Sequence, residues 1–351
     1  MRLYIFNPEH EIALAHGSPF FTAPRAGRLL RSDLGFLPAL WAMGDDIVWT
    51  DSPQKALEAT CKLGVEVPPR LFADTRMIKR VVNQVDGVEP WGWDAAIHQE
   101  LLRLGVRKEV MPTDEELERI RFISHRRQVN VLLEMMRLTN LKNKIVGECI
   151  EINNEADLLY QLNLRTKAVL KAPWSCSGRG VRLVTTPIDS VVYHWAKGII
   201  HSQGSIMLEP WYDKATDFGM EFFVDDTGIH YQGLSLFNTN KTAYTGNIIA
   251  SEEAKRSFLA QQISPKLIDE VCEAILFVFP QCFPNFYYGP FGIDMMVVKD
   301  KNDKKFIHPC VEINFRRTMG HVAIDLQKRH LRKKHAMKIA FEGGHYHLNL
   351  L

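Results

Sequence analysis

The amino-acid sequence predicts an α/β domain over about residues 1–115, followed by an α+β region that is rich in antiparallel strands. In the first part, strand-like and helix-like segments alternate, as in Asp46–Thr50 and Ser52–Leu63, and this alternation indicates a small parallel sheet. From Lys144 onward, short strand-like segments dominate. The two architectures are therefore expected in separate parts of the chain.

The first domain opens with an apolar, alternating segment, Arg2–Phe6, that breaks at Asn7-Pro8. This pattern predicts a strand that runs into a loop. Leu34–Met43 is helix-like. The pair Ser52-Pro53 is typical of a helix start, with serine as the N-cap and proline at the first helical position.

The second part of the chain begins near Thr113, where Thr113-Asp114-Glu115-Glu116 has the pattern of a capping box. A helical region is predicted from there to about Leu138. Strand-like segments follow at Val169–Lys171, Val181–Val184, Ser205–Trp211, Gly219–Val224, His230–Phe237, Gly292–Lys299 and Phe306–Phe315. The last part, Val322–Ala340, is predicted to be a basic helix.

Composition and charge limit the classes of function. The chain has 351 residues, 46% hydrophobic and 24% charged, as in ordinary globular proteins of two or three domains. Its net charge of +2 is close to neutral, so the basic clusters Arg119–Arg127 and Lys328–His335 are interpreted as solvated helix faces and no nucleic-acid partner is expected. The scattered cysteines and the short apolar runs lead us to expect a reduced, cytoplasmic protein without a membrane partner.

A segment rich in small residues, 169–184 (VLKAPWSCSGRGVRLV), is predicted to form a strand, a loop and a second strand. The loop offers backbone N–H groups and a guanidinium, which suit phosphate oxygens. A P-loop is disfavoured, because the spacing differs and no helix opens after the loop. A hairpin turn with small residues is the alternative. The candidate phosphate-binding residues are Lys171, Ser175, Ser177, Gly178, Arg179 and Gly180.

Two alternating segments, 292–299 and 306–315, flank a charged turn centred near Asp303. Strand residues two apart share a face, so Glu312, Asn314 and Arg316 point the same way. If the hairpin is symmetric about the turn, Asp294 lies opposite Glu312 on that face. Two carboxylates and an amide oxygen are donors that Mg²⁺ prefers, which predicts a metal site. The alternative is a solvent-facing hairpin edge, and a one-residue slip would move Asp294 to the other face.

Residues 206–224 (IMLEPWYDKATDFGMEFFV) are predicted to form a strand, a turn and another strand. The first strand ends at Glu209-Pro210-Trp211, where backbone groups can contact an adenine edge. Asp217 or Glu221 can accept hydrogen bonds from ribose hydroxyls. A purely structural strand–turn–strand is the alternative.

Taken in order, these three segments resemble the ATP-grasp superfamily, which includes D-alanine–D-alanine ligase, glutathione synthetase and biotin carboxylase. The resemblance covers about Ser124–His321. Asp294 followed by Glu312-Ile313-Asn314-Phe315-Arg316 looks like the family's Asp…Glu-x-Asn-x-Arg metal signature. Lys171 with the loop 174–180 resembles the phosphate-binding lysine and glycine-rich lid, and Glu209–Tyr212 resembles the adenine hinge.

The resemblance implies an ATP-grasp fold with an N-terminal Rossmann-like pre-ATP-grasp domain (1–115), a small subdomain that carries the lid (116–204) and a large subdomain that carries the metal site (205–351). It implies ATP, with one or two Mg²⁺ ions, or Mn²⁺, on Asp294, Glu312 and Asn314. The implied catalytic residues are Arg316, Lys171 and Arg179. The implied nucleotide-binding residues are Arg126, Lys171, Ser175, Ser177, Gly178, Arg179, Gly180, Glu209, Pro210, Trp211, Asp217 and Glu221.

Two positions depart from the family pattern. The family commonly has a second phosphate-binding lysine some forty-odd residues before the position of Lys171, whereas this chain has Ser124-His125-Arg126-Arg127 there. Arg126 or Arg127 would replace it, since a guanidinium binds phosphate in a fork geometry. The ribose carboxylate is either Asp217 or Glu221, and Glu221 matches the family pattern better.

The implied activity is that of an ADP-forming ligase that joins a small-molecule carboxylate to an amine or another nucleophile through an acyl phosphate. Arg316 would stabilise charge on the reacting group. The loop Asn7–Glu11 is a candidate for binding the acceptor, because α/β domains bind ligands at the carboxyl ends of their strands. His10, His16, Arg25 and Arg28 add charge nearby. An ordinary polar surface loop is the alternative.

Three other functions compete with the ligase. A kinase built on the same nucleotide site would need a general base near the transferred phosphate. No residue stands out for this role, and Asp217 and His321 are left open. A non-catalytic nucleotide-binding protein has little need of a full set of metal ligands. A nucleic-acid-associated protein is disfavoured by the near-neutral charge and the lack of aromatic platforms.

Overall fold

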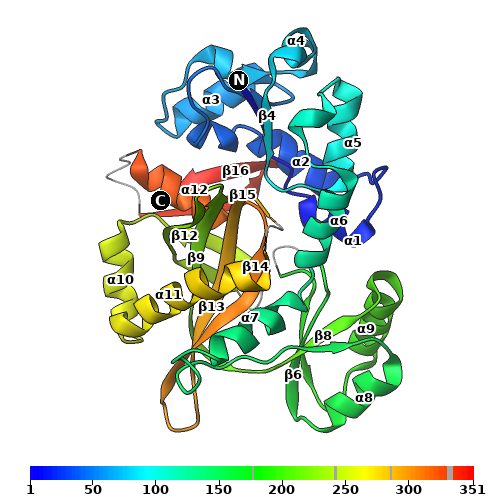
Figure 1. Cartoon of the computed structure of the whole chain (residues 1–351), viewed down its shortest axis with the longest axis vertical. Helices are drawn as coiled ribbons and strands as arrows, with labels where there is room; N and C mark the ends of the chain where they lie inside the picture. Colours follow the sequence, from blue (N-terminus) through cyan, green and yellow to red (C-terminus); the bar gives the residue numbers. More distant parts are fainter. Residues whose placement is uncertain (176–177, 241–242, 285–286, 330–334) are drawn as a thin grey trace. The chain divides into compact units, whose positions relative to one another are not determined.

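The computed structural model describes residues 1–175, 178–240, 243–284, 287–329 and 335–351 (Figure 1). The chain forms two compact units. Unit 1 comprises Met1–Phe122, Thr245–Ser251 and Arg316–Leu351, and unit 2 comprises Ile123–Tyr244 and Glu252–Phe315. None of the helices in the described ranges is both long and apolar enough to cross a membrane. The division of the chain at residues 115 and 204 stays a prediction.

Unit 1 contains a parallel sheet and an antiparallel sheet with helices around them. Its helices are α1 (His10–His16), α2 (Arg25–Leu34), α3 (Pro53–Lys62), α4 (Thr75–Val81), α5 (Ala95–Leu104), α6 (Asp114–Ile123) and α12 (Met319–Lys328), with short 3-10 helices at Leu37–Leu40, Pro69–Leu71, Val82–Gln84 and Lys108–Val110. Its strands are β1 (Arg2–Ile5), β2 (Ile47–Trp49), β3 (Phe72–Ala73), β4 (Gly87–Pro90), the end of β12 (Ala243–Ile248), β15 (Ala336–Glu342) and β16 (His345–Leu350).

The N-terminal sheet has the order β3-β2-β1-β4, and every neighbouring pair in it is parallel. The prediction of a parallel sheet in this part of the chain is confirmed. The helix starts follow from local sequence. Ser52 Oγ accepts from Lys55 N at 3.4 Å at the start of α3, and Asp94 Oδ1 accepts from Ala96 N and Ile97 N, both at 2.9 Å, at the start of α5. At the start of α6, Thr113 and Glu116 exchange the two hydrogen bonds of the predicted capping box.

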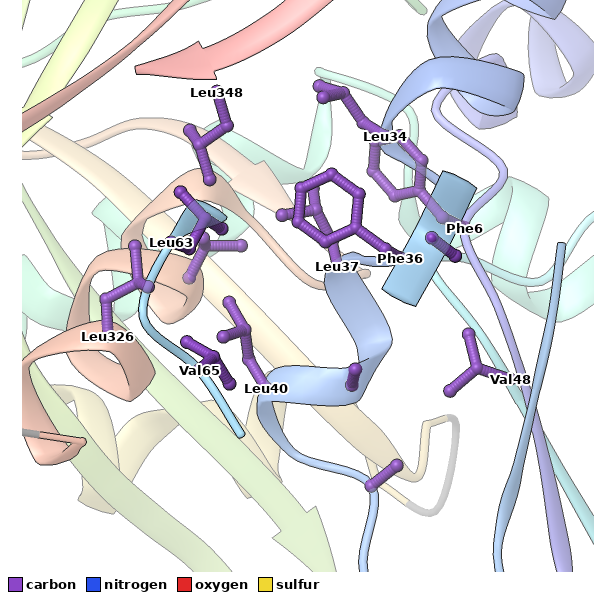
Figure 2. Packing of buried hydrophobic residues seen from close by; sticks show 14 of the residues in the cluster. Phe6, Leu34, Phe36, Leu37, Leu40, Val48, Leu63, Val65, Leu326 and Leu348 are labelled. Carbon is purple, nitrogen blue, oxygen red and sulfur yellow. The ribbon is translucent and has the colours of Figure 1, made fainter. Parts of the chain in front are cut away.

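One large hydrophobic cluster of unit 1 joins residues from distant parts of the chain (Figure 2). Figure 2 shows Phe6, Leu34 and Phe36 gathered close together, with Leu326 and Leu348 among the same group of side chains. A second cluster, which includes Leu3, Ile5, Ile97 and Leu101, fills the space between the sheet and α5. Alternate residues of β1 thus pack on opposite faces of the sheet, as expected for a strand covered on both sides.

Unit 2 is built mainly from antiparallel strands. Its strands are β5 (Ile150–Ile152), β6 (Lys167–Lys171), β7 (Val181–Thr185), β8 (Ile206–Pro210), β9 (Asp213–Asp225), β10 (Gly228–Ser235), β11 (Phe237–Asn240), β13 (Gly289–Lys299) and β14 (Lys305–Asn314). Its helices are α7 (Gln128–Arg137), α8 (Glu155–Asn163), α9 (Ser190–Gln203), α10 (Glu252–Ala260) and α11 (Pro265–Cys282).

Two four-stranded antiparallel sheets organise unit 2. The smaller has the order β5-β8-β6-β7, and α8 and α9 bury one face of it (Figure 1). The larger has the order β10-β9-β13-β14. Phe279 of α11 stacks on Phe291 with ring centroids 4.2 Å apart, and Phe222 stacks on Phe291 at 5.0 Å. This aromatic layer seals one face of the larger sheet and leaves the other face for polar side chains.

Three helix predictions were wrong. The helix expected over Leu34–Met43 lies earlier, as α2, because the apolar residues after Leu34 form a compact 3-10 turn in the core. The region from Thr113 to Leu138 is two helices, α6 and α7, separated by residues 124–127. The basic helix expected over Val322–Ala340 ends at Lys328, and β15 begins at Ala336 and pairs with β16. Tertiary pairing overrode local helical propensity there.

Candidate functional site

The polar face of the larger sheet carries the predicted metal ligands. Asp294 of β13 pairs with Glu312 of β14 and with Gly219 of β9, which confirms the predicted pair, although the register of the hairpin shifts between Asp294 and Met296. Because directly opposed residues point to the same side of an antiparallel sheet, Asp294 and Glu312 share a face. Asn314 lies on the same face, and its Nδ2 donates to Asp294 Oδ2 at 3.3 Å.

The donor set fits a hard divalent cation. Asp294 and Glu312 are only partly buried, and a Cβ on Gly219 would lie 3.6 Å from Asp294 Oδ1. Among the described residues no group of three or more His, Cys, Asp and Glu side chains is arranged to hold a metal. A cation on this face would therefore take oxygen atoms from Asp294, Glu312 and Asn314, and its remaining positions would be filled by phosphate oxygens and water.

A buried ion pair lies beside this face. Lys171, the last residue of β6, places Nζ 2.6 Å from Glu209 Oε2 at the end of β8, and the side chains are 8% and 3% exposed. Lys171 Nζ also donates to the carbonyl of Val311, next to Glu312, at 3.3 Å. Glu209 Oε1 is buried without a hydrogen-bond partner. The predicted phosphate-binding lysine and the first hinge residue are therefore in direct contact.

Arg126 is the second buried cation of the site. Its Nη2 lies 2.5 Å from Glu312 Oε1, and its Nη1 donates to Ala172 O at 2.5 Å and to Ser175 Oγ at 2.8 Å. Arg126 is 4% exposed, and its Nε has no partner. Arg126 lies in the segment 124–127 between α6 and α7, and its guanidinium thus contacts both the Glu312 carboxylate and the serine of the loop.

The glycine-bearing loop is closed at its base. Ala172 N donates to Gly180 O at 2.8 Å, and Val181 N donates to Gly178 O at 3.2 Å. Gly178 has a positive φ of 72°, which favours glycine. A Cβ on Gly180 would lie 2.3 Å from Ser175 Oγ. Arg179 is exposed, and Ser177, predicted to bind phosphate, lies outside the described residues.

The hinge candidates follow Glu209. Pro210 ends β8 opposite Ala168 of β6, and Trp211 is 39% exposed with Lys167 Nζ 5.2 Å from the centroid of its ring. The ring of Tyr212 meets the ring of His308 edge-on, with centroids 5.5 Å apart. The surface at Trp211 and Tyr212 is therefore aromatic.

The two ribose candidates differ in their surroundings. Asp217 pairs with Lys214 at 2.5 Å and accepts from Thr239 Oγ1 at 2.7 Å. Glu221 is 3% exposed and lies on β9 opposite Gly292 of β13. Gly292 is two residues from Asp294, so Glu221 and Asp294 lie on the same face of the sheet. Lys255 lies near Glu221: burial lowers the pKa of the Lys255 ammonium, and the carboxylates of Glu252 and Glu221 oppose this shift.

Two solved structures with the same fold are complexes with adenine nucleotides. N5-carboxyaminoimidazole synthetase from Staphylococcus aureus, complexed with ADP, aligns with a TM-score of 0.53 and 12% identity over 98% of this chain and 83% of that chain. The biotin carboxylase domain of 2-oxoglutarate carboxylase from Hydrogenobacter thermophilus, in complex with MgADP, ADP and bicarbonate, aligns with a TM-score of 0.50 and 12% identity over 82% of this chain and 69% of that chain. Biotin carboxylase is one of the ATP-grasp enzymes named above. The chain has the ATP-grasp fold. No protein-family model matches the chain, and no curated protein is significantly similar to it in sequence.

Within this ATP-grasp fold, one buried group beside Tyr212 was not among the predicted site residues. His308 on β14 is fully buried, and neither of its ring nitrogens has a hydrogen-bond partner. A Cβ on Gly147 would lie 2.8 Å from its Cε1. Burial, together with the charges of Lys171 and Arg137, lowers the pKa of His308 to about 3, so its ring is neutral. In the sequence, His308 and Cys310 form an isolated pair without a spaced second pair, which predicts buried or surface residues in preference to a zinc site.

The remaining catalytic candidate, Arg316, belongs to unit 1. Its Nε forms an ion pair with Glu11 of α1, and its Nη1 donates to Arg317 O at 2.8 Å. The structure thus brings Arg316 to the end of the Asn7–Glu11 loop. In the same loop region His10 is 1% exposed and hydrogen-bonded to Asp94 at 3.2 Å, which makes it part of the fold, whereas His16 and Arg25 are exposed.

Proposed function

We propose that this protein is an ATP- and Mg²⁺-dependent, ADP-forming ligase that joins a carboxylate to an amine or another nucleophile through an acyl phosphate. The observation that carries the proposal is the meeting of charges on β14. Asp294 faces Glu312 in register, while Arg126 binds Glu312 and Lys171 binds the carbonyl beside it. Carboxylates and cationic side chains that meet at one strand suit a ligand made of a metal ion and phosphate groups, because each phosphate oxygen can then contact the metal ion or a cationic donor.

The roles follow from the contacts. Asp294, Glu312 and Asn314 would hold one or two Mg²⁺ ions, or Mn²⁺, and the metal would neutralise charge on the phosphates. Lys171 and Arg126, both buried and both anchored to fixed acceptors, would orient the phosphates with little loss of side-chain entropy. By the family resemblance, Arg179 and Arg316 would stabilise charge on the reacting group. The loop 174–180, which includes Ser177, would exclude water from the acyl phosphate.

The nucleoside would be held at the hinge. Glu209, Pro210 and Trp211 would border the base, and Glu221, which shares the polar face with Asp294, would accept from the ribose in preference to Asp217. The ADP and MgADP bound in the two solved structures support a nucleotide of this kind. In this proposal residues 1–115 form a Rossmann-like pre-ATP-grasp domain, 116–204 the small subdomain and 205–351 the large subdomain.

The test is calorimetric titration of MgATP into the wild type, with and without EDTA, and into Glu312→Ala. Micromolar, EDTA-sensitive binding that is lost in Glu312→Ala is the expected result. Glu273→Ala, which removes an exposed carboxylate of α11 in the same unit, is the matched control and should bind like the wild type. Absence of binding at millimolar MgATP, or equal binding by Glu312→Ala, would overturn the proposal.

Product analysis then separates a ligase from a kinase. A ligase releases ADP and phosphate only when both a carboxylate and an acceptor are present. Phosphate that is found on an alcohol or sugar would replace the ligase by a kinase on the same nucleotide site.

A further inference from the structure

A pocket of about 520 Å³ opens at the carboxyl edge of the parallel sheet in unit 1. Its walls come from the residues that follow each strand: Glu9 after β1, Thr50 after β2, Thr75 after β3 and Asp94 after β4. The carboxyl ends of parallel strands meet at one edge, where open α/β sheets commonly bind ligands. The volume is in the range of small-molecule sites.

Two buried polar atoms in this pocket have no partner. Glu9 is 9% exposed, and its Oε1 accepts from Arg31 at 3.1 Å while its Oε2 has no hydrogen bond. Thr50 is 6% exposed, and its Oγ1 is also without a partner. Buried polar atoms are rarely left unpaired in folded proteins. Both belong to pocket-lining residues, and a rotation of either side chain toward the pocket would let a ligand with hydrogen-bond donors satisfy its oxygen. Burial also raises the pKa of the Glu9 carboxyl, whereas the positive charge of Arg31 acts to lower it.

Two exposed arginines line the same pocket. Arg28 donates from Nη1 to Ala23 O at 2.5 Å, and Arg103 places Cζ 5.7 Å from the centroid of the Phe20 ring. Neither forms an ion pair with another residue in the described part of the chain, whereas Arg31 has both Glu9 and Glu100 as partners. A guanidinium group without an ion-pair partner suits a carboxylate, which accepts two parallel N–H hydrogen bonds from it.

We propose that this pocket binds a free amino acid or a similar aminocarboxylate, with its ammonium group on Glu9 Oε2 and Thr50 Oγ1 and its carboxylate on Arg28 and Arg103. Phe20, which is 71% exposed, supplies an apolar wall for the side chain of the ligand. The assignment of this ligand as a substrate of the ligase rests on the proposed function, but its binding does not. In the proposed ligase reaction, this aminocarboxylate would supply the amine or the carboxylate.

The experiment titrates the wild type, without nucleotide, against a panel of free L- and D-amino acids. Those that bind are repeated as their N-acetyl and carboxamide derivatives. At least one amino acid should bind in the millimolar range or tighter, and each derivative should bind about tenfold or more weakly, because each loses one charge-assisted contact. Thr50→Val and Arg28→Ala should weaken binding similarly, while Arg25→Ala, an exposed arginine of the same helix outside the pocket, should not.

Several outcomes would overturn the proposal. These are no binding by any amino acid of the panel, binding that survives both N-acetylation and amidation, or binding that is unchanged in both Thr50→Val and Arg28→Ala. Thr50→Val replaces an unpaired hydroxyl by a methyl group and should fold normally, and the urea unfolding curve checks this. Amino-acid binding without MgATP binding would refute only the ligase, and MgATP binding without amino-acid binding would refute only this pocket.

Discussion

Two buried cations of unit 2 each form an ion pair with a carboxylate, whereas the pocket of unit 1 contains two side-chain oxygens without a hydrogen bond and an arginine without an ion pair among the described residues. In unit 2, Lys171 binds Glu209 and Arg126 binds Glu312. In unit 1, Glu9 Oε2 and Thr50 Oγ1 have no hydrogen bond, and Arg28 has no ion pair with a described residue. A matched pair holds its own geometry in the absence of a ligand. Unmatched groups lower the stability of the ligand-free protein. Removing one member of a matched pair should therefore destabilise the protein, whereas removing an unmatched group should not.

The largest effect is expected from breaking the buried pair of unit 2. Lys171→Met leaves the Glu209 carboxylate buried and unpaired, and should lower the free energy of unfolding by about 3–5 kcal/mol. The measurement is urea unfolding at neutral pH. The double variant Lys171→Met/Glu209→Leu should recover most of the loss, since it leaves no buried charge.

The control for this prediction is an exposed pair in the same unit. Lys197 and Glu155 lie 2.9 Å apart with side chains 54% and 39% exposed. Lys197→Met should cost less than about 1 kcal/mol. If Lys171→Met lowered the free energy of unfolding by as little as Lys197→Met, burial would not determine how much an ion pair contributes to stability.

The neutral, buried His308 predicts a dependence of stability on pH. Its pKa is about 3 in the folded protein against 6.5 for an exposed histidine, so the unfolded chain binds the extra proton between these values. The wild type should therefore lose stability as pH falls from about 6.5 toward 3, by up to about 1.4 kcal/mol per pH unit from this residue. The difference between the wild type and His308→Leu in urea unfolding across this range isolates the contribution. Parallel profiles for the two proteins would contradict the prediction.

A smaller, local effect is expected at the base of the glycine loop in unit 2. Gly180→Ala places a methyl group where Ser175 Oγ lies, which should displace Ser175 from Arg126 at a cost of about 1–3 kcal/mol. Faster tryptic cleavage after Arg179 or Arg182 measures the opening. Gly198→Ala, in α9 with open space around it, should stabilise by about 0.5–1 kcal/mol instead. Equal cleavage rates in the wild type and Gly180→Ala would count against the packing argument.

The smallest effect should have the opposite sign and lies in unit 1. Thr50→Val removes an unpaired buried hydroxyl, so stability should be unchanged or rise by about 1 kcal/mol. Thr60→Val removes an equally buried hydroxyl that donates to Leu57 O at 2.8 Å, and should lower stability by about 1 kcal/mol. Thermal unfolding of both variants decides the matter. Equal losses of stability in the two variants would mean that the Thr50 hydroxyl has a hydrogen-bond partner, which would contradict the prediction.

The sequence predicted those features that depend on local pattern. The pairing of Asp294 with Glu312 is the one predicted for a hairpin centred on Asp303, but the register is not uniform: Lys299 pairs with Lys305 near the turn, and a register shift between Asp294 and Met296 produces the predicted pair. The helix start at Ser52-Pro53 and the capping box at Thr113 depend on residues within one turn.

Features that depend on the path of the chain through space escaped prediction. Residues near Ala336 were expected to be helical because of their basic composition, but pairing with β16 decides their conformation. The loop Asn7–Glu11 was predicted to bind a ligand from its place after a strand. Thr50 and Arg103 were not linked to it, because only tertiary folding brings β2 and α5 to the same pocket. His308 was missed since burial, and not sequence spacing, sets its pKa.

Unit 1 is assembled from three separate segments of the chain, and this has a consequence for biosynthesis. The cluster that contains Phe6 and Phe36 also contains Val322, Leu326 and Leu348 (Figure 2). A ribosome delivers the first of these residues long before the last, so the nascent N-terminal segment must wait with apolar surface exposed until synthesis nears residue 351. The intervening residues of unit 2 form a nearly continuous stretch and can fold as they emerge. Chaperone demand during translation should therefore come from the first hundred residues, and a truncated N-terminal fragment should be insoluble where a fragment of unit 2 is not.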